Sequence, residues 1–207
     1  ITREVPREMT LDNIQDTISN FAQAARRAKQ AGFDAVEVLA GTGYLISEFF
    51  SPLTNQRTDE YGGSPDKRMR FGIEVAWAIR EAVGPGYTVI FRIAGNDFMA
   101  GGNTNKEAAQ FAYMLEQHGV DAFSITGGWH ETMLPQITMD VPRGAFVHLA
   151  SGVKAAVTKP VVACNRINDP GLAEEIIRDG RADLVGLARA RSEEHTSESS
   201  HRCISYA

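Results

Sequence analysis

The sequence predicts a parallel α/β fold that forms part of a (β/α)8 barrel, and three observations support this prediction. Helical and strand patterns alternate along the chain, which is typical of parallel strands joined by helical crossovers. A glycine that ends a helix, an aspartate within three residues and a short apolar run recur at Gly32, Gly119 and Gly180. The sequence contains no glycine-rich phosphate loop of a doubly wound sheet, and polar residues instead follow many different strands, as in a barrel.

The elements follow in order from the first helix. Its expected N-cap is Thr10, its apolar positions recur at helical spacing from Ile14 to Ala28, and Gly32 ends it before a buried strand at residues 35–39. Four further strands, each after a helical segment, are expected at residues 88–93, 122–126, 160–164 and 184–187. An eight-unit barrel needs about 250 residues. The sequence therefore predicts a partial TIM (β/α)8 barrel: about the last five βα units, with the N-terminal units missing and the C-terminal end truncated.

The segment after Ala190 departs from this alternation. Residues 191–207 are polar, show no amphipathic period and begin abruptly after a buried strand. The first part of this segment resembles translated sequencing-adapter DNA, and an ordinary polar tail is the alternative. We therefore predict two parts, a barrel fragment over residues 1–190 and a non-native or disordered tail over residues 191–207.

Composition and charge exclude several function classes. The 26 acidic and 21 basic residues give a net charge of −5, which argues against binding to nucleic acid. No apolar run approaches the roughly 18 residues of a membrane span, and the first residues contain no apolar secretion core. The two cysteines, Cys164 and Cys203, lie far apart, which excludes a disulfide framework or a Cys-rich zinc site. We expect a cytoplasmic protein that binds no metal, nucleic acid or membrane.

Functional residues of an α/β barrel lie at the carboxyl ends of its strands, an edge that we call the rim. Along the five expected strands these positions hold Tyr44, Arg92, His130, Arg166 and Arg189 in turn. Arginine is costly to bury without an anion, and its planar guanidinium suits phosphate. Because barrel phosphate sites commonly follow the last two strands, Arg166 and Arg189 predict a phosphate site. Internal salt bridges to rim carboxylates are the alternative.

Three other side chains have simpler interpretations. Trp77 fits the apolar face of a helix over residues 71–83 and is expected in the core. Cys164 ends a strand and is expected to be a small buried filler. Trp129 follows a strand, so it is expected on the rim beside the substrate.

A dense motif follows the first strand. It comprises Gly43-Tyr44-Leu45-Ile46, Phe50-Ser51-Pro52, Asn55, Arg57, Asp59, Tyr61-Gly62-Gly63-Ser64, Arg68 and Arg70-Phe71. This pattern is similar to the signature of the old yellow enzyme family, the NADH:flavin oxidoreductases, and the resemblance covers residues 7–190. Three further segments resemble the 2,4-dienoyl-CoA reductase branch: Gly128-Trp129-His130-Glu131, the segment over residues 141–146, and Asn165-Arg166-Ile167-Asn168-Asp169-Pro170.

The resemblance implies a bound FMN and an NAD(P)H electron donor that acts directly or through another redox centre. When the family's residues are matched to this sequence position by position, Arg92 falls near the flavin ring. It assigns the FMN phosphate to Asn165, Arg166, Ala188 and Arg189. The phosphate assignment agrees with the one reached from strand position alone.

The resemblance also implies the catalytic pair. Tyr44 would donate a proton with assistance from His130, and a tyrosine of ordinary pKa, about 10, keeps its proton at neutral pH. The implied activity is reduction of a small conjugated enoyl or dienoyl substrate, such as 2,4-dienoyl-CoA, by hydride from the flavin. Many old yellow enzymes carry histidines where this chain has Leu39 and Thr42, a departure that fits the dienoyl-CoA branch.

Two other functions stay open on the sequence alone. A barrel isomerase or aldolase would explain the arginines but not the motif around Tyr44, and Lys154 and Lys159 precede the fourth strand instead of following a strand, where a Schiff base would form. A catalytically inactive gene fragment is the other alternative. The sequence leaves open the exact substrate, the immediate electron donor, the presence of iron-sulfur and FAD domains, and the oligomeric state, a homo-oligomer being one of the assemblies it permits.

Overall fold

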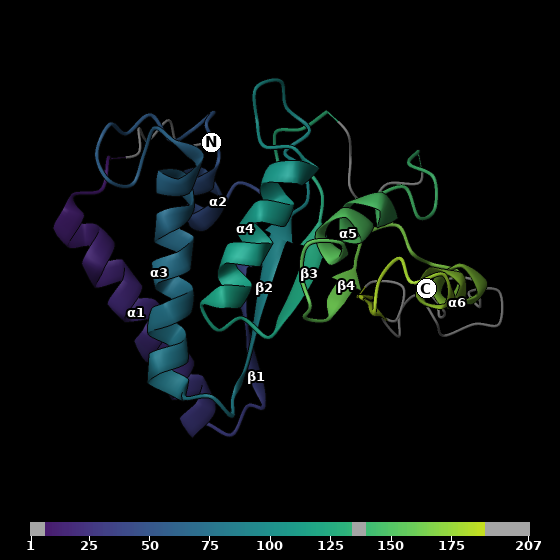
Figure 1. Cartoon of the computed structure of the whole chain (residues 1–207), viewed down its shortest axis with the longest axis horizontal. Helices are drawn as coiled ribbons and strands as arrows, with labels where there is room; N and C mark the ends of the chain where they lie inside the picture. The colour runs from purple at the N-terminus through teal and green to yellow at the C-terminus, as the bar shows by residue number, and fades with distance from the viewer. Residues whose placement is uncertain (1–6, 134–139, 189–207) are drawn as a thin grey trace.

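The computed structural model describes residues 7–133 and 140–188. Within them, five strands form one parallel sheet in sequential order (Figure 1). The strands are Ala35–Ala40 (β1), Thr88–Ala94 (β2), Ala122–Thr126 (β3), Val161–Ala163 (β4) and Leu184–Val185 (β5). Parallel strands in sequential order are the arrangement of a barrel wall, so the predicted partial (β/α)8 fold is confirmed.

The last two strands are shorter than the sequence suggested. We expected β4 over residues 160–164 and β5 over residues 184–187, but they span three and two residues. At β4 the cause is visible in the backbone, because Asn165 and Arg166 both have positive φ values, 69° and 56°, which turn the chain out of the sheet.

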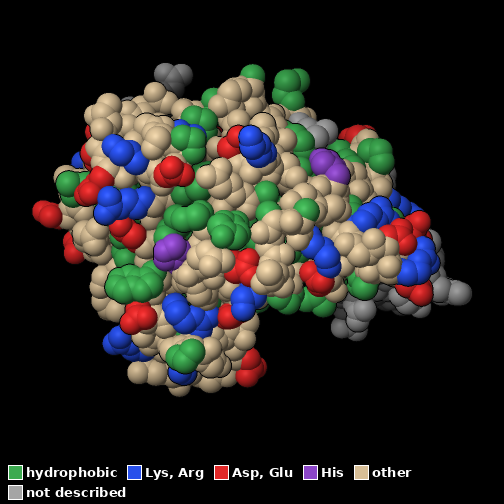
Figure 2. Space-filling view, in the orientation of Figure 1, with side chains coloured by type: hydrophobic (Ala, Val, Ile, Leu, Met, Phe, Trp, Pro, Cys, Tyr) green, Lys and Arg blue, Asp and Glu red, His purple; other side chains and the backbone are tan. Residues whose placement is uncertain are grey.

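The strands alternate with helices, and the long helices lie on one side of the sheet (Figure 1). The helices are Leu11–Gln30 (α1), Leu45–Phe50 (α2), Pro65–Val83 (α3), Asn105–Gln117 (α4), Val147–Lys154 (α5) and Pro170–Arg178 (α6). None of those in the described ranges is long and apolar enough to cross a membrane. On their outer face, basic and acidic side chains are interspersed (Figure 2).

The helix starts follow from capping chemistry. Thr10 caps α1 as predicted: its hydroxyl accepts from the backbone N–H of Asn13, whose side chain accepts in return from the N–H of Thr10. Thr104 and Glu107 form the equivalent capping box of α4. Asp169 caps α6 by accepting from the N–H of Leu172.

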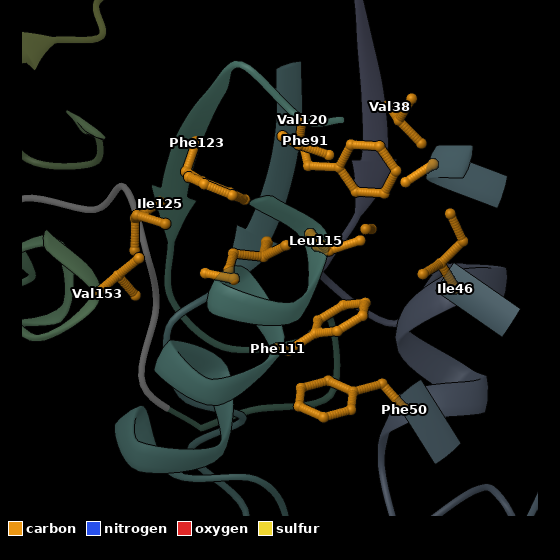
Figure 3. Packing of buried hydrophobic residues seen from close by; sticks show 14 of the residues in the cluster. Val38, Ile46, Phe50, Phe91, Phe111, Leu115, Val120, Phe123, Ile125 and Val153 are labelled. Carbon is orange, nitrogen blue, oxygen red and sulfur yellow. The ribbon is translucent and has the colours of Figure 1, made fainter. Parts of the chain in front are cut away.

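The core fills the space between the sheet and its helices. Alternate residues of β2, including Phe91, point toward α4 and are fully buried. Phe111 of α4 stacks on Phe50 of α2 with ring centroids 4.6 Å apart, below Phe91 (Figure 3). Our expectation for Trp77 is wrong: it is 57% exposed on the outer face of α3, because the apolar stripe that packs inward starts from Phe71 and excludes it.

The opposite face of the sheet is the inner side of the barrel wall. One row of residues is in register across the five strands on this face: Leu39, Arg92, Ser124, Val162 and Leu184. Leu39 and Leu184, on the two edge strands, are 40% and 52% exposed, whereas Ser124 in the middle of the row is 3% exposed, so this face is open at its edges.

Candidate active site

Tyr44 and His130 meet at the rim, although they follow different strands. Tyr44 is the N-cap residue of α2, just after β1, and His130 lies in the loop after β3. Their rings touch edge to face, with centroids 5.4 Å apart and an angle of 87° between the planes. Tyr44 is 49% exposed and His130 is also exposed, so both are accessible to a ligand. The structure thus brings together the two residues predicted to be catalytic.

Backbone contacts between the loops after β1 and β3 bring Tyr44 and His130 together. Thr42 and Trp129 form an isolated parallel bridge beyond the ends of β1 and β3. Thr42 and Gly43 have positive φ values, 60° and 89°, and a Cβ on Gly43 would lie 3.2 Å from the Trp129 ring. Gly43 N–H donates to Ser47 Oγ, which donates to the carbonyl of Tyr44. The first turn of α2 therefore holds the backbone of Tyr44 in place.

A buried carboxylate, Asp97, lies behind both loops. Its Oδ2 accepts from Ser51 Oγ and from the backbone N–H of Asn103, each at 2.8 Å, and its Oδ1 accepts from Trp129 Nε1 at 3.0 Å. Burial raises the pKa of Asp97, and these three hydrogen bonds oppose the rise. Asp97 was not among the predicted residues, because it lies beyond the end of the second strand. An acidic residue just beyond that strand was the available signal.

Trp129 follows β3 on the rim as expected, but its side chain is buried. It is 5% exposed, and its ring packs between the loop at Gly43 and the carboxylate of Asp97. A buried indole usually finds a partner for its N–H, which Asp97 provides. Trp129 therefore joins the two loops.

Two further carboxylates lie near the pair and were given no role from the sequence. Burial raises the pKa of Glu48 on α2, and the negative charge of Glu131 raises it further. The Glu131 carboxylate would be 3.6 Å from a Cβ on Gly43, so it faces the same turn. The rim around Tyr44 is thus acidic.

Arg92 lies on the inner face of the sheet, as its predicted role beside a flavin ring requires. Its guanidinium forms a salt bridge with Glu37 of β1, with 2.8 Å between Nη2 and Oε2, and the side chains are 39% and 36% exposed. Next to it in register, Ser124 Oγ lies 3.3 Å from Cys164 Sγ. Cys164 is buried as expected, and burial raises the pKa of its thiol.

The predicted phosphate residues are placed only in part. Asn165 and Arg166 form the left-handed turn after β4, and Arg166 Nε donates to the carbonyl of Val141 at 2.8 Å. Ala188 is exposed after β5. Arg189 lies outside the described residues, as does the predicted tail over residues 191–207.

The rest of the motif builds the loop that follows Ser51, the C-cap of α2, and leads to α3; we call this loop, residues 52–64, the signature loop. Asn55 Nδ2 donates to the carbonyls of Phe49 and Tyr61 at 2.6 and 2.7 Å. Arg57 donates three hydrogen bonds to Asp59, the shortest at 2.5 Å. These polar groups bond within or beside the loop and do not join the Tyr44–His130 pair.

Known proteins resemble the chain along most of its length. A sequence profile of the NADH:flavin oxidoreductase / NADH oxidase family matches residues 1–192. A metal reductase of Desulforamulus reducens is 57% identical over 190 residues, which cover 92% of this chain and 28% of that protein.

Solved structures give the same result. A 2-naphthoyl-CoA reductase in complex with 2-naphthoyl-CoA matches with a TM-score of 0.87 and 41% identity, covering 92% of this chain and 29% of that chain. An old yellow enzyme homologue from Zymomonas mobilis matches with a TM-score of 0.74 and 26% identity, covering 91% and 51%. The chain therefore spans between about a quarter and about a half of the proteins it matches.

Proposed function

The chain belongs to the NADH:flavin oxidoreductase / NADH oxidase family, and on this premise we propose that it forms the catalytic rim of an FMN-dependent enzyme that reduces conjugated enoyl or dienoyl substrates. The family predicted from the signature motif is confirmed, and the dienoyl-CoA branch is part of the proposal. One observation carries it: the edge-to-face pair of Tyr44 and His130, both accessible, at the same end of the sheet.

The residues present fit FMN at two points. A phosphate requires N–H donors and positive charge, and Arg166 lies where the chain turns sharply after β4. A flat ring requires an open surface, and on the inner face Arg92 is 39% exposed next to Leu39, which is 40% exposed. When bound, the flavin supplies the hydride chemistry. The protein would contribute the binding groups and the proton.

The proton comes from Tyr44 in this proposal. Its phenol O–H is the only transferable proton on that side chain, and it would pass to the substrate carbon that carries the developing negative charge. His130 lies against the Tyr44 ring and so limits the positions that the phenol can adopt. Because Tyr44 is half-exposed, its hydroxyl can regain a proton from solvent after each turnover.

An acyl-CoA thioester is the substrate class that we favour. Leu39 and Thr42 provide no imidazole to bind a simple enone oxygen, which disfavours small ketones and aldehydes. The similar 2-naphthoyl-CoA reductase was solved with a CoA thioester, and this supports the choice. NADH or NADPH is the proposed electron donor, directly or through a further redox centre.

The test separates the two half-reactions of the flavin-loaded protein. Tyr44→Phe should slow reduction of a dienoyl-CoA by about 10²–10⁴-fold, because positioned acid catalysis typically contributes that much. Flavin reduction by NADH should keep its rate. Tyr113→Phe is the matched control, since Tyr113 is similarly exposed, at 48%, on the outer helix α4. A Tyr44→Phe enzyme that reduces the dienoyl-CoA at the normal rate would contradict the proposal.

A further inference from the structure

The Asp97 carboxylate connects the two elements that carry the proposed catalytic pair. Through Ser51, it is bonded to the C-cap of α2, the helix that begins beside Tyr44. It also accepts a hydrogen bond from Nε1 of Trp129, which directly precedes His130 in the sequence. Both contacts are buried, with Asp97 3% and Ser51 0% exposed. No other described residue receives hydrogen bonds from the side chains of both elements.

We propose that Asp97 is a positioning residue that fixes the distance and angle between Tyr44 and His130 by holding α2 and the β3 loop with one carboxylate. This inference rests on the proposed function, since it assigns the pair a catalytic role. Asp97 touches neither ring of the pair in any contact that the structure shows, so it acts through Ser51 and Trp129.

The chemistry of the three donors explains why a carboxylate is needed. Asn103 N–H and Trp129 Nε1–H can only donate, and they approach different oxygens of Asp97. An amide at this position has one accepting oxygen and one donating nitrogen, so it must oppose one of those N–H groups. Glycine at position 102 leaves space for the carboxylate, because a Cβ on any other residue there would lie 2.9 Å from Asp97 Oδ2.

The arrangement of the loops makes a small shift reach the pair. Trp129 is bonded to Asp97 on one side, and on the other it forms a backbone bridge to Thr42 and packs its ring on Gly43. Losing the bond to Asp97 would therefore let Trp129 move relative to the turn that precedes Tyr44. A misplacement of about 1 Å can cost about 10²-fold in rate.

The test uses Asp97→Asn, which keeps the size of the side chain. In the flavin-loaded protein, we expect reduction of a dienoyl-CoA to slow by about 10–10²-fold while flavin reduction by NADH changes by less than about twofold. In the 207-residue chain, the indole N–H signal of Trp129 should shift in heteronuclear NMR spectra, and it can be assigned because the chain has only two tryptophans.

Asp121→Asn is the matched control. Asp121 is also bonded to a backbone N–H, that of Val89 at 2.9 Å, and to Arg80, but it lies before β3, at the amino end of the sheet. It should leave both the Trp129 signal and the ratio of the two half-reactions unchanged. If Asp97→Asn does not fold, Trp129→Phe and Ser51→Ala each remove one contact of the intact carboxylate and should each slow substrate reduction selectively.

Two outcomes would overturn the inference alone. One is a normal rate of dienoyl-CoA reduction in Asp97→Asn despite a shifted Trp129 signal. The other is equal slowing of both half-reactions, which would indicate a general structural role. Failure of the proposed function is distinguishable, because Tyr44→Phe would then reduce the substrate normally, and the inference would fall with it.

Discussion

The signature loop and the rim around Tyr44 are neighbours in the fold, yet they treat their charged groups in opposite ways. In the loop, Arg57 donates hydrogen bonds to Asp59 and lowers the pKa of that carboxyl below its usual value. At the rim, burial raises the pKa of Glu48 and of Asp97, and the structure shows no cation paired with either one among the described residues. The loop therefore satisfies its own charges, whereas the rim keeps groups whose protonation responds to their surroundings.

The signature motif from Gly43 to Phe71 therefore contains two kinds of residue, those that build the loop and the one at the rim. Of its polar side chains, Asn55, Arg57 and Arg68 all bond to backbone or carboxylate groups around the loop. Tyr44 alone remains half-exposed at the rim. A family signature can thus be mostly architectural, with its proposed chemistry confined to one end. Carboxylates with perturbed pKa values cluster at functional sites, although structural ion pairs such as Arg57–Asp59 perturb them too.

The largest expected effect on stability comes from crowding the signature loop. A Cβ on Gly62 would lie 2.2 Å from the carbonyl oxygen of Arg57, so Gly62→Ala must displace backbone. We expect a loss of about 3 kcal/mol or more in the free energy of unfolding. Urea denaturation measures it, and the rate per bound flavin should not change, since the loop does not join the rim.

Gly63→Ala is the control in the same loop. Gly63 has a φ of +88° but nothing within 4 Å of its ideal Cβ, so only backbone strain remains, at about 1–2 kcal/mol. Equal losses for the two variants would show that crowding against Arg57 does not hold the loop. A changed rate per bound flavin would break the separation between loop and rim.

A smaller effect is expected at the phosphate end of the rim. Arg166→Ala should weaken FMN binding by about 10–10²-fold, because a hydrogen bond to a charged group contributes about 1.5–3 kcal/mol. Equilibrium dialysis of FMN measures this. Arg143→Ala removes a nearby arginine that is 47% exposed and 3.6 Å from Asp169, and it should have little effect. Equal retention of FMN by both variants would remove Arg166 from the proposed site.

The smallest expected effect is on the pH dependence of stability, which should have opposite signs for Asp59 in the signature loop and Asp97 at the rim. The folded state lowers the pKa of Asp59, so its stabilisation is present above its ordinary pKa of 3.8 and is lost as the pH falls through the folded value. The folded state raises the pKa of Asp97, so the stability that this group contributes is present at low pH. It is lost as the pH rises through the pKa of the folded state.

The Asp59→Asn variant isolates the contribution of the loop carboxylate to the free energy of unfolding. Because Asp59 is 33% exposed, we expect a loss of about 1 kcal/mol or less near neutral pH. The difference from the unchanged chain should shrink as the pH falls below 3.8 and disappear below the lowered pKa of the folded state. Urea midpoints across this range provide the measurement. A difference that persists undiminished in acid would assign the effect to lost packing and not to charge.

The sequence identified the elements better than it identified their partners. The apolar run at residues 35–39 and the cap at Thr10 follow from local chemistry, and both lie where predicted. Trp77 was misassigned because helical periodicity alone did not fix which side of α3 faces the core. Arg92 was singled out from its place near the end of the second strand, but its partner Glu37 depends on the register between β1 and β2. Asp97 was missed because it lies beyond its strand.

What the sequence determined by itself is the order and direction of the parallel units and the type of residue that ends each strand. These features are local, since they rest on periodicity, capping and the glycine that ends each helix. Only the tertiary structure decided that Tyr44 meets His130 and that Asp97 holds both of their loops. Such contacts join residues from separate βα units. They depend on strand register and on the packing of loops, which no local pattern encodes.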